Sequence, residues 1–244
     1  MASVALITGA SRGIGRAVAL RLARDGYTVV LNYRRNERAA QDTAQILQAL
    51  GADGMLCCAD VTDESAVRRM VKTIEEQYGH IDLRVNNAGV AEQALFTDLT
   101  ASQWRAMMDV HVNAAFYTCS AVLPLMIRRK SGCIVNIASM WGQVGASCEV
   151  HYSTAKAALI GLTKALAKEV GPSGIRVNCV SPGAVDTDMM AGFSDADREA
   201  IAGETPLGRL GKPEEIASAV SFLASSDASF ITGQVIAPNG GLVI

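Results

Sequence analysis

The fold is decided by the stretch VALITGASRGIG at residues 4–15. It opens with a short apolar run, Val4 to Ile7, of the kind that forms a buried parallel strand. A glycine-rich turn with the spacing G-x-x-x-G-x-G follows, and helical periodicity then runs from Arg16 to Arg24. Glycine permits a tight turn and close backbone approach, and a helix N-terminus offers unpaired N–H groups to an anion. The stretch therefore predicts a phosphate site; a structural turn without a ligand is the alternative.

Strand and helix signals alternate along the rest of the chain. Further strands are expected at 28–32, 54–59, 83–86, 134–138, 175–180 and 235–237, and helices at 38–50 and 64–79. This alternation predicts an α/β fold: a single doubly wound parallel sheet (a Rossmann fold) with helices on both faces. Ligands bind such sheets at the carboxyl ends of the strands. The glycine turn, Asp60, Asn87, Ser139 and Pro182 all follow such ends, which predicts a single cleft.

Ser139, Tyr152 and Lys156 form a second pattern. Tyr152 and Lys156 are four residues apart, which places them on one face of a helix, and Ser139 precedes the tyrosine. A lysine ammonium near a phenol favours the phenolate and is expected to lower the tyrosine pKa from its reference of about 10. Such a tyrosine can protonate an alkoxide, or deprotonate an alcohol, near neutral pH. The alternative is an exposed helical pair without a chemical role.

Together these two patterns resemble the short-chain dehydrogenase/reductase family over essentially the whole chain. Asp60-Val61, Asn86-Asn87-Ala88-Gly89, Pro182-Gly183 with Thr187, and Ile231-Thr232-Gly233-Gln234 match the family in order and spacing. The resemblance implies that Ser139, Tyr152 and Lys156 are catalytic. It implies a nicotinamide cofactor site made by Gly9, Ser11, Arg12, Gly13, Ile14, Gly15, Tyr33, Arg34, Asp60, Val61, Asn87, Ala88, Gly89, Tyr152, Lys156, Pro182, Gly183 and Thr187.

The residues after the second strand indicate which nicotinamide cofactor is used. In the family an acidic residue at this position bonds the ribose hydroxyls of NAD. Here Tyr33 stands there, and Arg34 and Arg35 follow. With no carboxylate to repel a phosphate and two cations to receive it, NADP is favoured. The alternative is that both arginines are solvated loop charges.

Composition excludes several classes of protein. Half of the 244 residues are hydrophobic and the net charge is −2, which argues against disorder and against a basic surface for nucleic acid. The sequence contains no run of 18 apolar residues, so no membrane span is expected. Neither the six cysteines nor the three histidines have metal-ligand spacing, so no metal is expected. Free thiols favour a cytoplasmic location.

Three positions depart from the family pattern. His111 stands where an asparagine usually holds a water beside the lysine, and Asn113 is expected to face elsewhere. Arg84 replaces a strand residue that is usually aliphatic, and a buried arginine would need a partner. Asn239 precedes two glycines where aspartate is frequent.

Within the family the chain is most similar to bacterial 3-oxoacyl-acyl-carrier-protein reductases, which implies NADPH-dependent reduction of a ketone to a secondary alcohol. The segment from Trp141 to Tyr152 is also similar to elongation factor P 5-aminopentanone reductases. A basic cluster, Arg128-Arg129-Lys130, could dock an acidic carrier, whereas Ser173 stands where some relatives have a second basic residue. Hydroxysteroid or sugar alcohol oxidation is a further possibility, and a catalytically inactive NADP-sensing protein is the non-enzyme alternative.

Length and composition favour one domain, residues 1–244, with a substrate-covering loop at 186–210 that is expected to be irregular. The family resemblance and the apolar ending at 236–244 imply a homo-oligomer, expected to be a tetramer.

Overall fold

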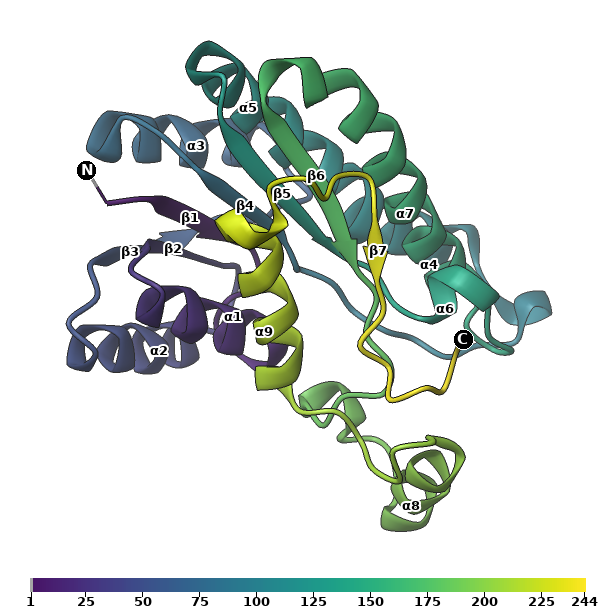
Figure 1. Ribbon diagram of the computed structural model, residues 1–244. Helices are drawn as coiled ribbons and strands as arrows, with labels where there is room; N and C mark the ends of the chain where they lie inside the picture. The colour runs from purple at the N-terminus through teal and green to yellow at the C-terminus, as the bar shows by residue number, and fades with distance from the viewer. Residues whose placement is uncertain (1) are drawn as a thin grey trace.

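Seven parallel strands form one sheet in the order β3-β2-β1-β4-β5-β6-β7 (Figure 1). The computed structural model describes residues 2–244. The strands are β1 (Val4–Ile7), β2 (Thr28–Tyr33), β3 (Gly54–Cys58), β4 (Leu83–Asn86), β5 (Gly132–Ile137), β6 (Ile175–Val180) and β7 (Val235–Ile236). The order reverses at β1, so the crevice between the ends of β1 and β4 is the expected ligand position. The predicted doubly wound fold is confirmed.

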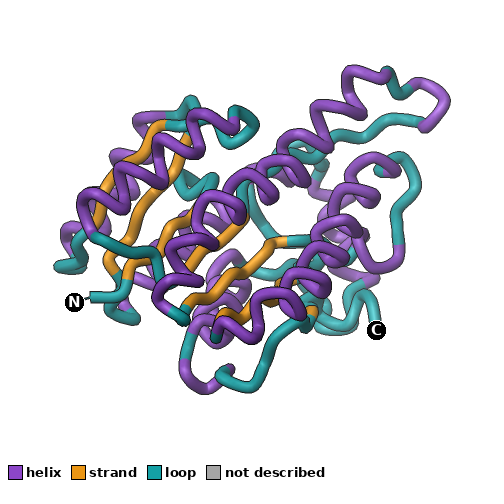
Figure 2. Tube along the Cα trace, turned by 90° about the horizontal axis from the view of Figure 1, so that it is seen from above, coloured by secondary structure: helices purple, strands orange, loops and turns teal. Residues whose placement is uncertain are grey.

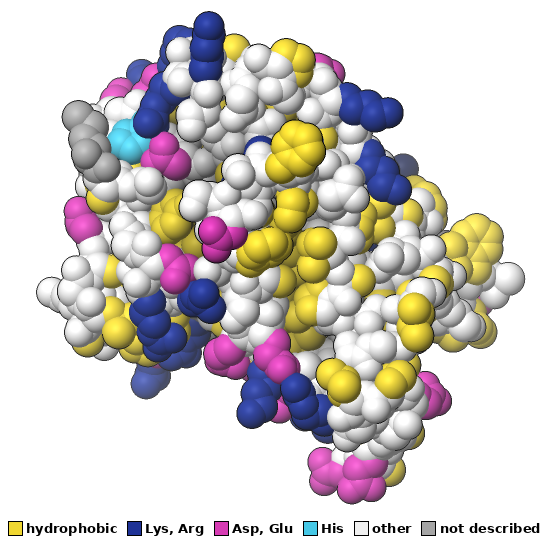
Figure 3. All heavy atoms as spheres, viewed as in Figure 1, with side chains coloured by type: hydrophobic (Ala, Val, Ile, Leu, Met, Phe, Trp, Pro, Cys, Tyr) yellow, Lys and Arg dark blue, Asp and Glu magenta, His cyan; other side chains and the backbone are white. Residues whose placement is uncertain are grey.

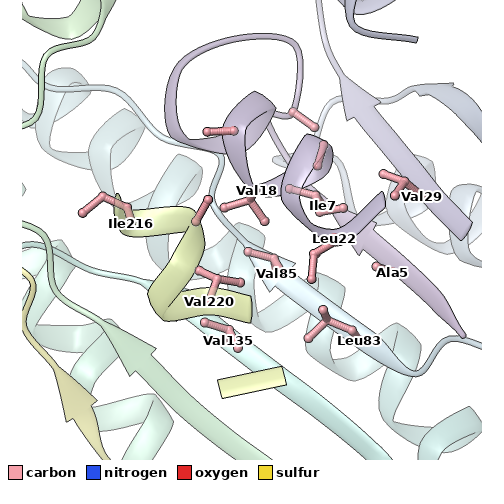
Figure 4. Close-up of a cluster of buried hydrophobic side chains, with 14 of the residues drawn as sticks. Ala5, Ile7, Val18, Leu22, Val29, Leu83, Val85, Val135, Ile216 and Val220 are labelled. Atoms are coloured by element: carbon pink, nitrogen blue, oxygen red, sulfur yellow. The ribbon is translucent and has the colours of Figure 1, made fainter. Parts of the chain in front are cut away.

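Helices lie on both sides of the sheet, as Figure 2 shows from above. They are α1 (Gly13–Arg24), α2 (Glu37–Ala49), α3 (Glu64–Tyr78), α4 (Ala101–Met108), α5 (Ala114–Arg129), α6 (Trp141–Val144), α7 (Val150–Val170), α8 (Asp195–Glu204) and α9 (Pro213–Ala224). On one face, α1 and α9 pack against β1, β4 and β5, where Val18, Leu22 and Val220 meet Ile7 and Val85 (Figure 4). On the other face, residues of α3, α5 and α7 form a second buried cluster.

Most predicted boundaries agree with the structure to within one or two residues. The exception is α1, which begins at Gly13 rather than at the expected Arg16. The last part of the glycine turn is already helical, because Arg16 N–H donates to the carbonyl of Arg12. The turn and the helix N-terminus are therefore one structure.

The helical stretch Ala101–Arg129 runs through α4, a π-helical turn at Asp109–Asn113 and α5. By length and composition alone it could cross a membrane. This is weak evidence, because core helices of water-soluble proteins pass the same test. Several of its buried residues, Cys119, Val122, Leu125 and Met126, belong to the cluster shared with α3 and α7. A π-helical turn inside an α-helix is rare and often marks a functional site, and here it contains His111.

The segment 186–210 is more regular than the sequence analysis expected. It holds one 3₁₀ turn, Asp188–Met190, and the helix α8, which projects from the rest of the molecule in Figure 1. Ser194 caps α8, since its hydroxyl accepts from Asp197 N–H while the Asp197 carboxylate accepts from Ser194 N–H. The segment thus contains a helix that was not expected, and the Ser-x-x-Asp capping signal marks where that helix begins.

Candidate active site

The glycine turn packs closely against the residues that follow β4. Gly9 and Gly13 have φ angles of 62° and 54°, in the left-handed region that favours glycine. A Cβ at Gly9 would lie 3.0 Å from Ala88 Cα, and a Cβ at Gly15 would lie 2.5 Å from Asn87 Nδ2. The turn therefore needs glycine both for its backbone angles and for its contact with the Asn87–Ala88 segment.

The start of α1 fits an anionic group. The first N–H groups of a helix have no intrahelical acceptor. Within residues 2–244 no side chain caps α1, and no acidic residue lies in its first turn. The N–H groups of Gly13, Ile14 and Gly15 are thus available to a phosphate. Ser11 lies in the same turn, and the Arg12 guanidinium pairs with Asp188 at 3.3 Å, which connects the turn to segment 186–210.

Thr8 and Asn87 join the ends of β1 and β4. The side-chain amide nitrogen of Asn87, Nδ2, donates to the carbonyls of Thr8 and Gly9 at 2.9 and 3.1 Å. The Thr8 hydroxyl oxygen accepts from the backbone N–H groups of Asn87 and Ala88 at 3.1 and 3.2 Å. These bonds hold the glycine turn against the Asn87–Ala88 segment.

Arg84 is buried in β4, and its partners are oxygens of neutral groups. Its guanidinium donates to the carbonyls of Leu6 and Val85 at 3.1 and 2.9 Å and to the Thr8 hydroxyl at 3.3 Å. Burial lowers the pKa of Arg84 to about 10, so the side chain still carries its charge at neutral pH. The partners that a buried arginine needs are thus two strand carbonyls, of Leu6 and Val85, and the Thr8 hydroxyl.

The ends of β2 and β3 hold the residues expected near the adenosine part of a cofactor. Tyr33 ends β2, and Arg34 Nε lies 3.3 Å from Asp60 Oδ2. Burial alone would raise the pKa of Asp60, but hydrogen bonds from Thr62 and the charges of Arg34 and Arg35 outweigh it and hold that pKa below its usual value. Val61, the next residue, is buried against Val67 and Ala114.

Ser139, Tyr152 and Lys156 come together at the carboxyl edge of the sheet. Ser139 follows β5, and Tyr152 and Lys156 lie in the first two turns of α7. Lys156 Nζ donates to the Ile137 carbonyl at 2.8 Å and lies over the Tyr152 ring, 5.5 Å from its centroid. All three candidate catalytic residues are buried. The arrangement holds a hydroxyl, a phenol and an amine beside one another.

Burial is the largest cause of the pKa shifts of Tyr152 and Lys156. It raises the pKa of Tyr152 to about 12, although the neighbouring Ser139 hydroxyl opposes the shift. It also lowers the pKa of Lys156 to about 8. Burial thus raises the pKa of Tyr152, where the sequence spacing predicts a lowering by Lys156. The Lys156 ammonium lies over the ring and bonds to the Ile137 carbonyl.

His111 lies beside this group. The rings of His111 and Tyr152 meet edge to face, with centroids 5.5 Å apart and planes at 83°. The His111 Nε2 atom is 2.8 Å from the Val90 carbonyl oxygen. Asn113 instead donates to the Asp109 carboxylate at 2.6 Å. The structure thus agrees with the expectation that residue 111, and not residue 113, faces the site.

Pro182, Gly183 and Thr187 follow β6 at the carboxyl edge of the sheet. The Pro182 carbonyl accepts from Met140 N–H at 2.9 Å, which ties this loop to the segment that carries Ser139. A Cβ at Gly183 would lie 2.8 Å from Asn239 Cα, so this glycine permits a close backbone contact. Thr187 lies opposite Gly13: a Cβ added at Gly13 would be 3.7 Å from Thr187 Cγ2.

Two carboxylates and a buried histidine near the start of α7 are not predicted from the sequence to have a role. Glu149 precedes α7 and accepts from Gln93 at 3.2 Å, and its charge contributes to the raised pKa of Tyr152. Glu92 lies 3.8 Å from His151 Nε2. The His151 ring is fully buried, and neither of its nitrogens has a hydrogen-bond partner among the described residues. Segments 92–94 and 148–151 are far apart in sequence, so only the fold shows their proximity.

Comparisons with known proteins agree with this geometry. A family model described as enoyl-(acyl carrier protein) reductase matches residues 9–243. The chain is 46% identical to an uncharacterized oxidoreductase, YmfI, of Bacillus subtilis over 242 residues, which cover 99% of both chains. It is 40% identical to a 3-oxoacyl-[acyl-carrier-protein] reductase, FabG, of Staphylococcus aureus over 99% of this chain and 98% of the relative. The chain belongs to the short-chain dehydrogenase/reductase family.

Another relative is the FabG reductase of Chlamydia muridarum, 42% identical over 98% of this chain and 96% of that protein. As a short-chain dehydrogenase/reductase, the chain is an oxidoreductase of a family that uses nicotinamide cofactors. The uncapped start of α1, with its unpaired N–H groups, and the glycine turn beside Asn87 fit such a cofactor.

Proposed function

We propose that this protein reduces a ketone to a secondary alcohol with NADPH. The observation that carries the proposal is the meeting of Ser139, Tyr152 and Lys156 at the sheet edge that also carries the glycine turn. Bound NADPH supplies the hydride that goes to the carbonyl carbon. Tyr152 gives its phenolic proton to the carbonyl oxygen, so that a C–H and an O–H bond form as the C=O double bond becomes single. Ser139 holds and polarises that oxygen.

The residue roles follow from the contacts. Since burial holds the pKa of Tyr152 near 12, the phenol keeps its proton until a carbonyl oxygen takes it. Lys156 is anchored on Ile137 and supplies positive charge beside the ring as the phenolate forms. Gly9, Ser11, Arg12, Gly13, Ile14 and Gly15 would hold the pyrophosphate. Asn87, Ala88, Gly89, Pro182, Gly183 and Thr187 would line the rest of the cofactor cleft.

The preference for NADP over NAD rests on the end of β2. Tyr33 offers no carboxylate to the ribose. The positive charges of Arg34 and Arg35 both help to lower the pKa of Asp60, so both guanidinium groups lie near this point. A phosphate on the ribose would find two guanidinium groups, and charge-assisted bonds of this kind are strong.

The first candidate substrate is a 3-oxoacyl thioester on an acyl carrier, as the names of the FabG relatives suggest. The cluster that could dock a carrier is less available than the sequence implied. Arg128 pairs with Glu75 at 2.8 Å and Arg129 with Asp82 at 3.1 Å. Both arginines also lie at the end of α5, just before β5 begins. They are therefore at the amino edge of the sheet, whereas Ser139 follows the carboxyl end of β5.

A second candidate is favoured by two carboxylates near the start of α7, Glu149, whose charge acts on Tyr152, and Glu92, which lies 3.8 Å from His151. Glu92 and Glu149 would repel an acidic carrier and attract a ketone that bears an ammonium group. An elongation factor P modified with 5-aminopentanone would present such a group.

The wider assignments of the chain are part of the same proposal. We assign residues 1–244 to one NADP-binding domain, with 186–210 covering the substrate. We place the protein in the cytoplasm as a homo-oligomer, without nucleic-acid or membrane partners.

A panel of ketones tests the proposal and ranks the substrates. NADPH oxidation is followed with an acetoacetyl thioester, small neutral ketones, an amino ketone and aminopentanone-modified elongation factor P, and alcohol oxidation is followed with a hydroxysteroid and a sugar alcohol. Turnover of any ketone supports the reaction class, whereas NADPH binding without turnover of any ketone or alcohol would indicate a sensing protein. Glu92→Gln with Glu149→Gln should weaken kcat/KM for the amino ketone about tenfold, as expected when a favourable charge contact is lost, and leave the neutral ketone unchanged. The matched control is Glu75→Gln, at the far edge of the sheet.

A further inference from the structure

The side chain of His111 lies between the backbone after β4 and the ring of Tyr152. It is 3% exposed and sits in the π-helical turn of the long helix. We infer that His111 is a positioning residue, which holds the Tyr152 ring and the Gly89–Val90 backbone in one fixed arrangement. The inference rests on the proposed function, in which Tyr152 is the proton donor.

The first support is the fit of the ring to Gly89. A Cβ added at Gly89 would lie 2.9 Å from His111 Nδ1 and closer still to Cε1. Side-chain atoms do not approach this closely, so any residue other than glycine at position 89 would displace the ring. The three atoms nearest to that added Cβ all belong to the His111 imidazole. Gly89 and His111 are therefore complementary in shape.

The second support is the hydrogen bond that orients the ring. His111 Nε2 is 2.8 Å from the Val90 carbonyl oxygen and 3.3 Å from the Val90 nitrogen. Depending on the tautomer, Nε2 donates to the Val90 carbonyl or accepts from the Val90 N–H, and either bond fixes the orientation of the ring. Nδ1 has no partner among the residues that the structure describes. Burial and the charge of Lys156 hold the pKa of His111 well below its ordinary value, so the ring is neutral.

The third support is the lack of free space around the ring. A cavity of about 10 Å³ lies beside it, lined by Thr8, Arg84 and His111 among others. That volume is about what a single water molecule requires. An imidazole pushed away from Gly89 cannot enter it. The displaced ring would instead press on Tyr152, whose ring it meets edge to face.

These contacts give His111 a defined effect on the proposed reaction. A shift of the ring would move the Tyr152 hydroxyl relative to Ser139 and to the carbonyl it must protonate. Misplacement of a reacting group by about 1 Å can cost about 100-fold in rate.

The test is a double-mutant cycle of Gly89→Ala, His111→Asn and the double variant, with Gly161→Ala as the matched control. A Cβ at Gly161 of α7 meets nothing within 4 Å, so the same added methyl should be harmless there. We expect Gly89→Ala to lower kcat about 100-fold, by the misplacement argument above. Because Gly89 also lies in the proposed cofactor site, NADPH affinity is measured in both backgrounds, and any loss caused through the His111 ring should be reversed by His111→Asn together with the loss in kcat. The smaller side chain of His111→Asn should restore the Gly89→Ala variant to within about threefold of His111→Asn alone.

Three results would overturn the inference. One is a Gly89→Ala variant as active as Gly161→Ala. Another is a double variant as impaired as Gly89→Ala. The third is an equal loss of NADPH affinity from Gly89→Ala in both backgrounds, which would place the methyl against the cofactor. If Gly89→Ala does not fold, recovery of a cooperative thermal transition in the double variant decides instead.

One readout is independent of turnover. The phenolate absorbance of each variant, minus that of the same variant with Tyr152→Phe, gives the titration of Tyr152 alone. We expect Gly89→Ala to shift this titration and the double variant to reverse the shift. If the unmodified protein reduces no ketone, the proposed function fails, yet the titration still reports whether His111 positions Tyr152. An unchanged titration in Gly89→Ala would contradict the positioning role.

Discussion

Arg34 and Asp60 form an ion pair, with 3.3 Å between Arg34 Nε and Asp60 Oδ2, at the point where the ends of β2 and β3 meet. Both side chains are more than a third exposed, so the pair itself adds little stability. Its effect is to hold a guanidinium beside the position expected for the adenosine ribose. The pair uses Nε and leaves other N–H groups of Arg34 free for a phosphate.

Replacement of Arg34 and Arg35 by alanine should separate the two cofactors. Loss of charge-assisted bonds to a phosphate costs about 1.5–3 kcal/mol, so KM for NADPH should rise at least about tenfold while KM for NADH changes little. Steady-state kinetics with both cofactors measure this. Asp60→Asn is the control, because it keeps both cations, and it should not raise KM for NADPH selectively. An equal effect of the double alanine variant on NADH and NADPH would show that the arginines do not read the phosphate.

Lys156 should make stability depend on pH. Its folded pKa of about 8 lies below its ordinary value of 10.5, because the ammonium is buried. Below pH 8 both the folded and the unfolded protein carry this proton, and the folded state bears the full cost of burying the charge. Between about pH 8 and 10 the folded protein has released the proton while the unfolded chain keeps it, so this cost falls as pH rises.

The expected result is a pH-dependent effect of Lys156→Met. The variant should gain most in free energy of unfolding, relative to the unaltered protein, near pH 7, and the gain should shrink toward pH 10. Loss of the bond to Ile137 adds a constant offset of about 1 kcal/mol. Denaturant titrations at several pH values measure the difference, with Lys164→Met, on the exposed side of α7, as control. A difference that does not vary with pH, or that grows with pH, would contradict the buried charge.

Much of the fold could be predicted because its signals are local. The apolar run at Val4–Ile7 and the glycine turn after it specify a strand and a helix start within a dozen residues. Alternation of such units then leaves few topologies. The helix α8 is hard to predict because Gly192, Gly203 and Pro206, in and around it, favour turns and oppose the Ser194 capping signal.

The candidate site could be predicted only in its residue types. Ser139, Tyr152 and Lys156 were found by spacing, yet the raised pKa of Tyr152 depends on burial, which spacing does not report. The fit of His111 against Gly89 joins two segments whose proximity is set by the sheet and the π-helical turn. Glu92 beside His151 is a tertiary contact of the same kind.

Assembly is the next expected outcome. Phe116 and Phe230 are 56% and 103% exposed, and hydrophobic side chains gather at the centre of Figure 3, over α9 and β7. Large exposed apolar patches commonly mark interfaces between proteins. We expect a homo-oligomer, most simply a tetramer. Light scattering at micromolar concentration measures the mass, and a value near the 25.6 kDa of one chain would contradict this prediction.

The central claim is tested most directly by NADPH oxidation with Tyr152→Phe. Phenylalanine keeps the ring against His111 and Lys156 and removes only the proton donor. With a ketone that the unaltered protein reduces, kcat should fall by about 100-fold or more, the usual scale of general acid catalysis, while NADPH binding by fluorescence is retained. A kcat within about twofold of the unaltered protein, with NADPH bound normally, would contradict the account.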